Sequence, residues 1–195
     1  MRPEEIAAKL TPIQVHTLLL AEADNRNPIR GKLWLQKEMF LVSRAVPELA
    51  SELGYEPSLK GPMSEALEWN VDQLVSVDLL RHEGHAFALT DSGLACARAV
   101  SREIGSERRE LIEEAKGLLN GLTKDELLGF VYFLYPDMVT ESEELEELMP
   151  KRKDLAVRLF EKGKVGLERG AQVAGLDVQE FASFLGKQGI SRYAD

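Results

Sequence analysis

The segment at residues 64–90 constrains the fold most, because a capped amphipathic helix is followed at once by a hairpin pattern. Ser64 is a suitable N-cap for a helix with one apolar face. That face is formed by Leu67, Val71, Leu74 and Val75. The next stretch, LLRHEGHAFALT, has turn residues Glu83-Gly84 between two segments that can pair, and this predicts a short antiparallel hairpin.

Helix signals also precede and follow this segment. Thr11-Pro12 opens one predicted helix, and a second runs from about residue 31 until Pro47 breaks it. Thr90 caps a further helix after the hairpin. Three helices followed by a hairpin are the order of a winged helix-turn-helix domain, predicted here for residues 1–105. A generic helical domain with one irregular turn is the alternative.

A helical and acidic middle segment is predicted for residues 106–150, which carry a net charge of -8. Capping boxes begin two of its helices, Thr123 with Glu126 and Thr140 with Glu143. The acid-rich run after Thr140 is most simply a solvated helix face, with a docking surface or a DNA mimic as the alternative. Met149-Pro150-Lys151 is interpreted as a linker, because the charge changes sign there.

The last segment, residues 151–195, has a net charge of +3 and a pattern of its own. Ala171 and Gly175 stand four apart, Leu176 follows, and Phe181 lies six beyond the glycine. This spacing is typical of a helix-turn-helix unit, in which a small residue lies where the helices touch and glycine adopts a positive φ in the turn. A plain helical hairpin used for packing is the alternative. The fold class predicted for the whole chain is therefore mainly α.

The composition favours a cytoplasmic protein that is not embedded in a membrane. The chain has 195 residues, 44% of them hydrophobic, and the uncharged run near residues 127–136 is too short to span a bilayer. The single Cys96 excludes an internal disulfide and fits a reducing compartment. The net charge of -9 argues against nucleic acid as a partner for the chain as a whole, although its last segment is basic.

Few residues are available for catalysis or metal binding. His82-Glu83-Gly84-His85 is the one cluster of histidine and acid, and it lacks the further ligands of a zinc site, so we interpret it as a polar hairpin tip. His16 lies on a predicted helix and is expected to pack there. No glycine-rich phosphate loop is present. We therefore predict no enzyme activity, no catalytic residue, no metal and no cofactor.

Two parts of the chain resemble known families. Residues from about 12 to 148 resemble YwgA-like winged-helix proteins, and the first blocks also resemble the related Panacea-type antitoxin domains. The blocks are GKLWLQKEMFLV, KGPMSEALEWNVDQL, FALTDSG and FVYFLYPDMVTESE, although Leu59 and Met63 stand where relatives often have aromatic residues. Residues from about 152 to 192 resemble small prokaryotic proteins of antitoxin type, through EKGKVG, AQVAG, QEF, FL and QGI. Both resemblances imply prokaryotic regulation.

The residues suited to DNA lie mainly in the last segment. The helix after Ser64 has no Lys or Arg up to residue 79, and only Asn70 and Gln73 could read base edges there. The predicted DNA contacts are Lys162, Lys164, Arg169, Gln172, Gln179, Lys187 and Arg192. Secondary contacts from the hairpin region are Lys60, Arg81, His82 and His85. Asp177 and Glu180 weaken this interface, so one copy should bind weakly.

These features predict a prokaryotic DNA-binding regulator of antitoxin type that uses its C-terminal helix-turn-helix unit. A homodimer would place two copies on two half-sites, with the apolar helices of the middle segment as the expected interface. The alternative is a non-enzymatic interaction module that binds a partner protein, such as a toxin, without touching DNA.

Overall fold

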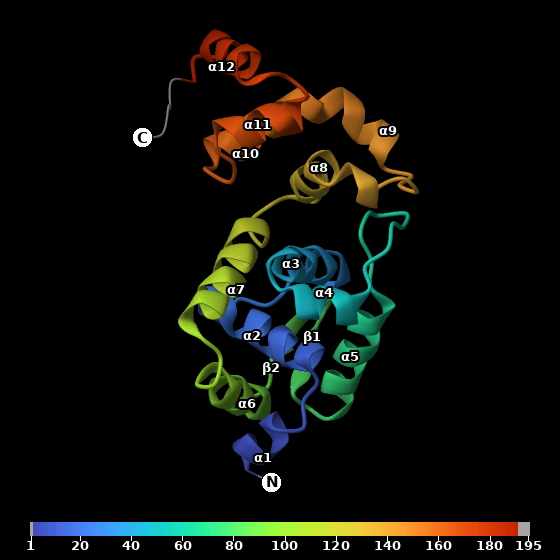
Figure 1. Ribbon diagram of the computed structural model, residues 1–195, viewed down its shortest axis with the longest axis vertical. Helices are drawn as coiled ribbons and strands as arrows, with labels where there is room; N and C mark the ends of the chain where they lie inside the picture. Colours follow the sequence, from blue (N-terminus) through green and yellow to red (C-terminus); the bar gives the residue numbers. More distant parts are fainter. Residues whose placement is uncertain (1, 191–195) are drawn as a thin grey trace. The chain divides into compact units, whose positions relative to one another are not determined.

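The computed structural model describes residues 2–190 and is mainly helical, with one two-stranded antiparallel sheet (Figure 1). The chain forms two compact units. Unit 1 contains the residues up to Glu56 together with Met63–Gly121. Unit 2 contains Pro57–Pro62 together with the residues from Leu122 onward. A short internal segment of the first half of the sequence therefore packs with the second half.

Unit 1 contains both strands and the first group of helices. Its elements are α1 (Pro3–Ala7), α2 (Pro12–Arg26), α3 (Lys32–Ala45), α4 (Pro47–Leu53), α5 (Glu65–Ser76), β1 (Leu80–Glu83), β2 (Ala86–Leu89), α6 (Asp91–Ser101) and α7 (Ser106–Leu119). The break predicted at Pro47 is confirmed, and Pro47 itself begins α4, because proline is accepted at the first helical position.

Three predicted caps are confirmed in unit 1. The hydroxyl oxygens of Thr11, Ser64 and Thr90 accept hydrogen bonds from the backbone N–H groups of Gln14, Leu67 and Gly93 respectively. Ser64 is fully buried, and its hydroxyl also donates to the carbonyl of Leu53 at 2.5 Å. The cap therefore ties the start of α5 to the end of α4.

The predicted hairpin is present, with its turn one residue later than expected. Glu83 pairs with Ala86, so Gly84 and His85 form the two-residue loop, and Gly84 adopts a φ of 62°. Left-handed backbone at the first loop position favours glycine, which explains the shift of the turn. Ile29, between α2 and α3, exchanges two hydrogen bonds of 2.9 Å with Phe87 of β2.

The core of unit 1 extends beyond residue 105. The predicted apolar face of α5 is buried at Leu67, Val71 and Leu74. The helix α7 packs against α2 and α3 and buries Ile112 and Ala115 among the core residues. The predicted middle segment, residues 106–150, is therefore divided between unit 1 and unit 2, because its first helix belongs to the core that the earlier helices form.

Unit 2 is built from helices. Its elements are α8 (Lys124–Leu134), the 3-10 helix η1 (Pro136–Met138), α9 (Leu145–Leu148), the 3-10 helix η2 (Met149–Lys151), α10 (Arg152–Glu161), α11 (Leu167–Ala174) and α12 (Val178–Lys187). The helices α8, α10 and α11 pack against one another, and α12 packs on α11. The capping box predicted at Thr123 and Glu126 is confirmed.

Two predictions for the acidic run are wrong. Thr140 does not begin a helix, because the backbone there bonds to Pro57–Pro62 instead: the N–H of Glu143 and the hydroxyl of Ser142 both donate to the carbonyl of Leu59. Only α9 remains helical, without a capping box. The expected linker at Met149 is η2, which continues directly into α10. Within residues 2–190 no helix is long and apolar enough to cross a membrane.

Candidate nucleic-acid interface

The turn between α11 and α12 has the geometry that its sequence predicts. Gly175 ends α11 with a φ of 69°, its N–H donates to Gln172, and the N–H of Leu176 donates to the carbonyl of Ala171 at 3.1 Å. These bonds close the helix as in a Schellman motif. The positive φ favours glycine here, and a Cβ on Gly175 would also lie 2.7 Å from the guanidinium of Arg152, which would have to shift.

The contact between α11 and α12 is close because one residue is a glycine. A Cβ on Gly170 would lie 2.5 Å from the ring of Phe181, which is fully buried. On its other side, Phe181 meets the ring of Phe160 edge to face, with the ring centroids 6.0 Å apart. Phe181 therefore holds α12 against both α10 and α11.

Arg152 organises this region, and sequence reasoning did not identify it. Its guanidinium donates to the carbonyls of Gln172 and Val173, two of the last acceptors of α11. It also lies over the ring of Phe133, 4.6 Å from the centroid. A cation at a helix C-terminus satisfies orphan carbonyls and complements the helix dipole. No short motif marks this role, because its partners lie about twenty residues away in the sequence.

The outward face of α12 is polar and carries no carboxylate at its centre. Phe181 and Leu185 are buried on one side of the helix, and Gln179, Ser183 and Lys187 are exposed. A spacing of four residues places these three side chains on successive turns of one face. We call Gln179, Ser183 and Lys187 the outward stripe. Ser183 was not among the predicted contacts, because a serine on a helix carries no signal of its own.

The two acidic residues of α12 have a structural role. Asp177 is the N-cap and accepts from the N–H of Glu180 at 2.8 Å, while the Glu180 carboxylate accepts from the N–H of Asp177 at 3.2 Å. This capping box keeps both carboxylates at the positive end of the helix dipole. The acids that weakened the sequence-based assignment therefore serve to begin the helix.

A shallow groove of about 440 Å³ runs beside the outward stripe. It is lined by Lys153, Leu176, Asp177, Gln179, Glu180, Ser183, Phe184 and Lys187. The ammonium of Lys153 on α10 lies 5.9 Å from the ring centroid of Phe184. The groove is thus lined by two cations, Lys153 and Lys187, and also by the two capping acids.

The other predicted contacts of this unit are placed differently. Arg169 and Gln172 are exposed on α11, and Lys164 is half-buried. The ammonium of Lys162 donates to the carboxylate of Glu126 at 2.7 Å, so its charge is already compensated. Arg192 lies outside the described residues.

The ion pair with Lys162 also explains the acidity of Glu126. Burial by itself raises the pKa of the Glu126 carboxyl, but the hydrogen bonds from Lys162 and from the backbone of Thr123 outweigh it, and the net pKa is lowered. Glu126 is thus a fixed anion that joins α8 to the end of α10.

The predicted hairpin contacts are divided between the two units. Lys60 belongs to unit 2, whereas Arg81, His82 and His85 belong to unit 1. The guanidinium of Arg81 forms an ion pair of 2.5 Å with the carboxylate of Glu83. The ring of His82 packs on the ring of Phe87, with the ring centroids 4.9 Å apart. His85 is exposed in the turn. Among residues 2–190 no group of histidine, cysteine or acidic side chains is arranged to hold a metal ion.

The helix α5 offers even fewer base-reading groups than its sequence suggested. Asn70 is buried, its side-chain oxygen accepts from the hydroxyl of Thr11 at 2.8 Å, and its amide donates to the carbonyl of Ala66. The interpretation of Asn70 as a group able to read bases is therefore wrong, because it is used to fasten α5 to the start of α2. Gln73 remains exposed.

Comparison with known proteins gives one match. Residues 133–195 match the model of the Uncharacterised protein family UPF0175, which covers about a third of the chain. The matched region begins near the end of α8 and includes α10, α11 and α12. No curated protein and no solved structure matches the chain.

Proposed function

We propose that α11 and α12 form a helix-turn-helix unit that binds duplex DNA, with α12 as the helix that enters the major groove. The outward stripe is the observation that carries this proposal. An amide, a hydroxyl and an ammonium on successive turns can reach base edges and phosphates, while Phe181 and Leu185 anchor the opposite face.

The surrounding residues fit the supporting role of the first helix. Arg169 and Gln172 are exposed on α11, where the first helix of such a unit crosses the phosphate backbone. Lys153 adds a cation from α10 at the groove. Phosphate contacts set the position of the protein on the duplex, and base contacts set its sequence preference.

For unit 1 we propose a winged-helix arrangement. The order of α2, α3 and α5 followed by the hairpin of β1 and β2 supports it. So does the antiparallel β-bridge between Phe87 of β2 and Ile29, which lies between α2 and α3. The likeness of residues 12–148 to YwgA-like proteins is part of the same proposal. This unit is not the DNA reader, because α5 carries acids and no cation.

The biological role we propose is that of a non-enzymatic regulator of antitoxin type that acts on DNA as a homodimer. The resemblance of residues 152–192 to antitoxin-type proteins supports the role. Each copy contributes few cations, and two copies on adjacent half-sites would strengthen binding. The apolar side of α8 is not available as the dimer interface. Its residues Leu127, Leu128 and Val131 are buried where α8 packs on α10 and α11 of the same chain.

The test is a binding titration with the DNA that lies upstream of the protein's own coding sequence, at low salt. We expect the double variant Arg169→Glu/Lys187→Glu to lose binding and Ser183→Glu to weaken it strongly, because both place negative charge against phosphates. The controls are Arg102→Glu, on an exposed site of unit 1, and the hairpin variant Arg81→Glu; both should bind like the wild type. Equal loss in the controls, or no binding of any fragment, would overturn the proposal.

A further inference from the structure

The outer face of α5 presents a large aromatic side chain to solvent. Trp69 is 60% exposed, and Val77, just beyond the helix, is exposed to the same degree. The protein's other tryptophan behaves differently: Trp34 donates its indole N–H to the carbonyl of Leu119 and packs under the guanidinium of Arg30. Exposed tryptophans on rigid elements are enriched among residues that dominate the energy of protein interfaces.

The backbone beneath Trp69 is held firmly. The opposite side of α5 packs on α2, α4 and β1. Ser64 caps the helix, and Asn70 binds both Thr11 and the carbonyl of Ala66. Figure 1 shows α5 at the outside of unit 1, with its far side uncovered by other elements of that unit. Trp69 is thus presented on a pre-organised surface, which lowers the entropic cost of binding.

Negative charge surrounds this ring without compensation. Glu65 lies one turn before Trp69, Asp72 lies one turn after it, and both side chains are exposed. No Lys or Arg occurs at residues 64–79, and within residues 2–190 neither carboxylate forms an ion pair. Two cations of unit 1 are paired with other acids, Lys32 with Glu68 at 3.3 Å and Arg81 with Glu83.

We propose that the face formed by Glu65, Trp69, Asp72, Gln73 and Val77 binds a basic segment of a partner protein. An arginine of the partner would lie over the Trp69 ring, and neighbouring cations would pair with Glu65 and Asp72. DNA is disfavoured, because its phosphates would meet the two carboxylates. A second copy of the chain is disfavoured as well, since a symmetric contact would bring the same acids together.

This proposal is independent of DNA binding by α12. The two surfaces use different residues, so the two activities can fail separately. If both hold, unit 1 carries a surface for a basic protein and unit 2 carries a surface for DNA.

The probe is a fluorescein-labelled amphipathic peptide of roughly 16 residues with arginines along one helical face, followed by anisotropy at about 0.15 M salt. We expect Trp69→Ala to weaken binding roughly tenfold or more, because it removes the aromatic anchor without changing the charge. Glu65→Gln/Asp72→Asn should weaken it by a similar factor. In a Trp34→Phe background, which leaves Trp69 as the one tryptophan, peptide binding should also shift the emission of Trp69 to shorter wavelength.

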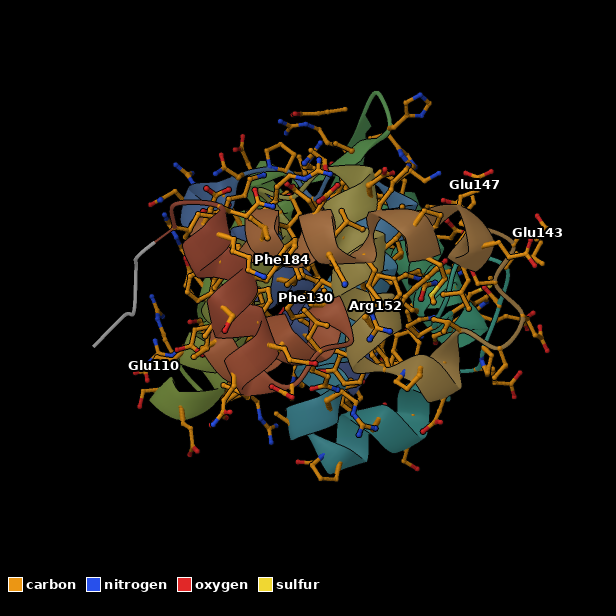
Figure 2. All side chains as sticks on the ribbon, turned by 90° about the horizontal axis from the view of Figure 1, so that it is seen from above. Glu110, Phe130, Glu143, Glu147, Arg152 and Phe184 are labelled. Carbon is orange, nitrogen blue, oxygen red and sulfur yellow. The ribbon has the colours of Figure 1, made fainter. Side chains whose placement is uncertain are left out.

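The matched control is Glu143→Gln/Glu147→Gln, which removes two exposed acids from the other acidic surface of the chain (Figure 2). This control and Arg169→Glu/Lys187→Glu should both bind the peptide like the wild type. Equal weakening by the two acid pairs, an unchanged affinity in Trp69→Ala, or no binding at this salt concentration would overturn the proposal. So would self-association that Trp69→Ala abolishes, or a Trp69 emission shift caused by duplex DNA.

Discussion

The ring of Phe181 lies so close to Gly170 that no Cβ fits between them, because the added atom would be 2.5 Å from the ring. This single contact sets the distance between α11 and α12, and through it the placement of the outward stripe. Leu185 is the other fully buried side chain of α12.

Gly170→Ala should therefore lower the free energy of unfolding by about 1–3 kcal/mol, since a methyl group would overpack this contact. Gly186→Ala is the matched control on α12. Apart from its chain neighbours and the backbone of its own helix, no atom of residues 2–190 lies within 4 Å of its added Cβ, so the better helix propensity of alanine should raise the free energy of unfolding by about 0.5–1 kcal/mol. Urea denaturation measures both values. Destabilisation by both alanines to the same extent would contradict the contact.

Arg152→Ala should lower the free energy of unfolding by about 2 kcal/mol, because the carbonyl of Val173 loses its donor and the carbonyl of Gln172 keeps only the N–H of Gly175. Arg152→Lys should recover only a small part, since an ammonium cannot reproduce the planar fork of the guanidinium. Arg158→Ala on the same helix is the control. The guanidinium of Arg158 donates an exposed hydrogen bond of 3.4 Å to the backbone carbonyl of Asp154, so we expect a change within about 0.5 kcal/mol. Thermal unfolding followed by circular dichroism separates the three variants.

Glu38 should make stability fall as pH rises. Its carboxylate is fully buried without a hydrogen-bond partner among residues 2–190, and burial raises its pKa to about 8 although Lys116 acts in the opposite direction. The folded protein thus keeps this proton up to about pH 8, whereas the unfolded chain releases it near 4.5. Between these values the folded state binds more protons, and the free energy of unfolding decreases with pH.

Glu38→Gln removes this dependence. The free energy of unfolding of this variant, relative to that of the wild type, should increase from about pH 5 to pH 8 with a limiting slope of about 1.4 kcal/mol per pH unit. Urea unfolding at several pH values measures this difference. Glu110→Gln is the control, because Glu110 is exposed, and its pH profile should run parallel to that of the wild type (Figure 2). A constant difference between Glu38→Gln and wild type across this range would contradict the assignment.

The salt dependence of DNA binding should report individual phosphate contacts. Replacing Arg169 or Lys187 by glutamine should reduce the slope of log K against log salt concentration by about 1 for each residue. Lys162→Gln should have a smaller effect, because that ammonium is paired with Glu126. Arg102→Gln should leave the slope unchanged. Slopes that are identical in all four variants would show that these cations do not meet phosphate.

Much of the local structure follows from the sequence alone. Thr11, Ser64, Thr90 and Thr123 mark the helix starts correctly, since a cap bonds to a backbone group only three residues away. The three-and-four spacing of α5 identifies its buried face for the same reason. Gly175 at the end of α11 is equally local, because its positive φ and the bonds across the turn involve neighbouring residues.

Contacts between distant residues were decided only in the tertiary structure. The helix expected at Thr140 does not form, because the carbonyl of Leu59, far away in the sequence, accepts hydrogen bonds from the backbone N–H of Glu143 and the hydroxyl of Ser142. Arg152 caps the end of α11, and the buried Asn70 links α5 to Thr11 by a hydrogen bond. Both roles depend on partners that no short pattern encodes. Short-range hydrogen bonds fix where helices begin and end, whereas packing selects which side chains remain exposed. The acidic, tryptophan-bearing face of α5 and the polar stripe of α12 are therefore products of tertiary packing acting on helices that the sequence had already specified.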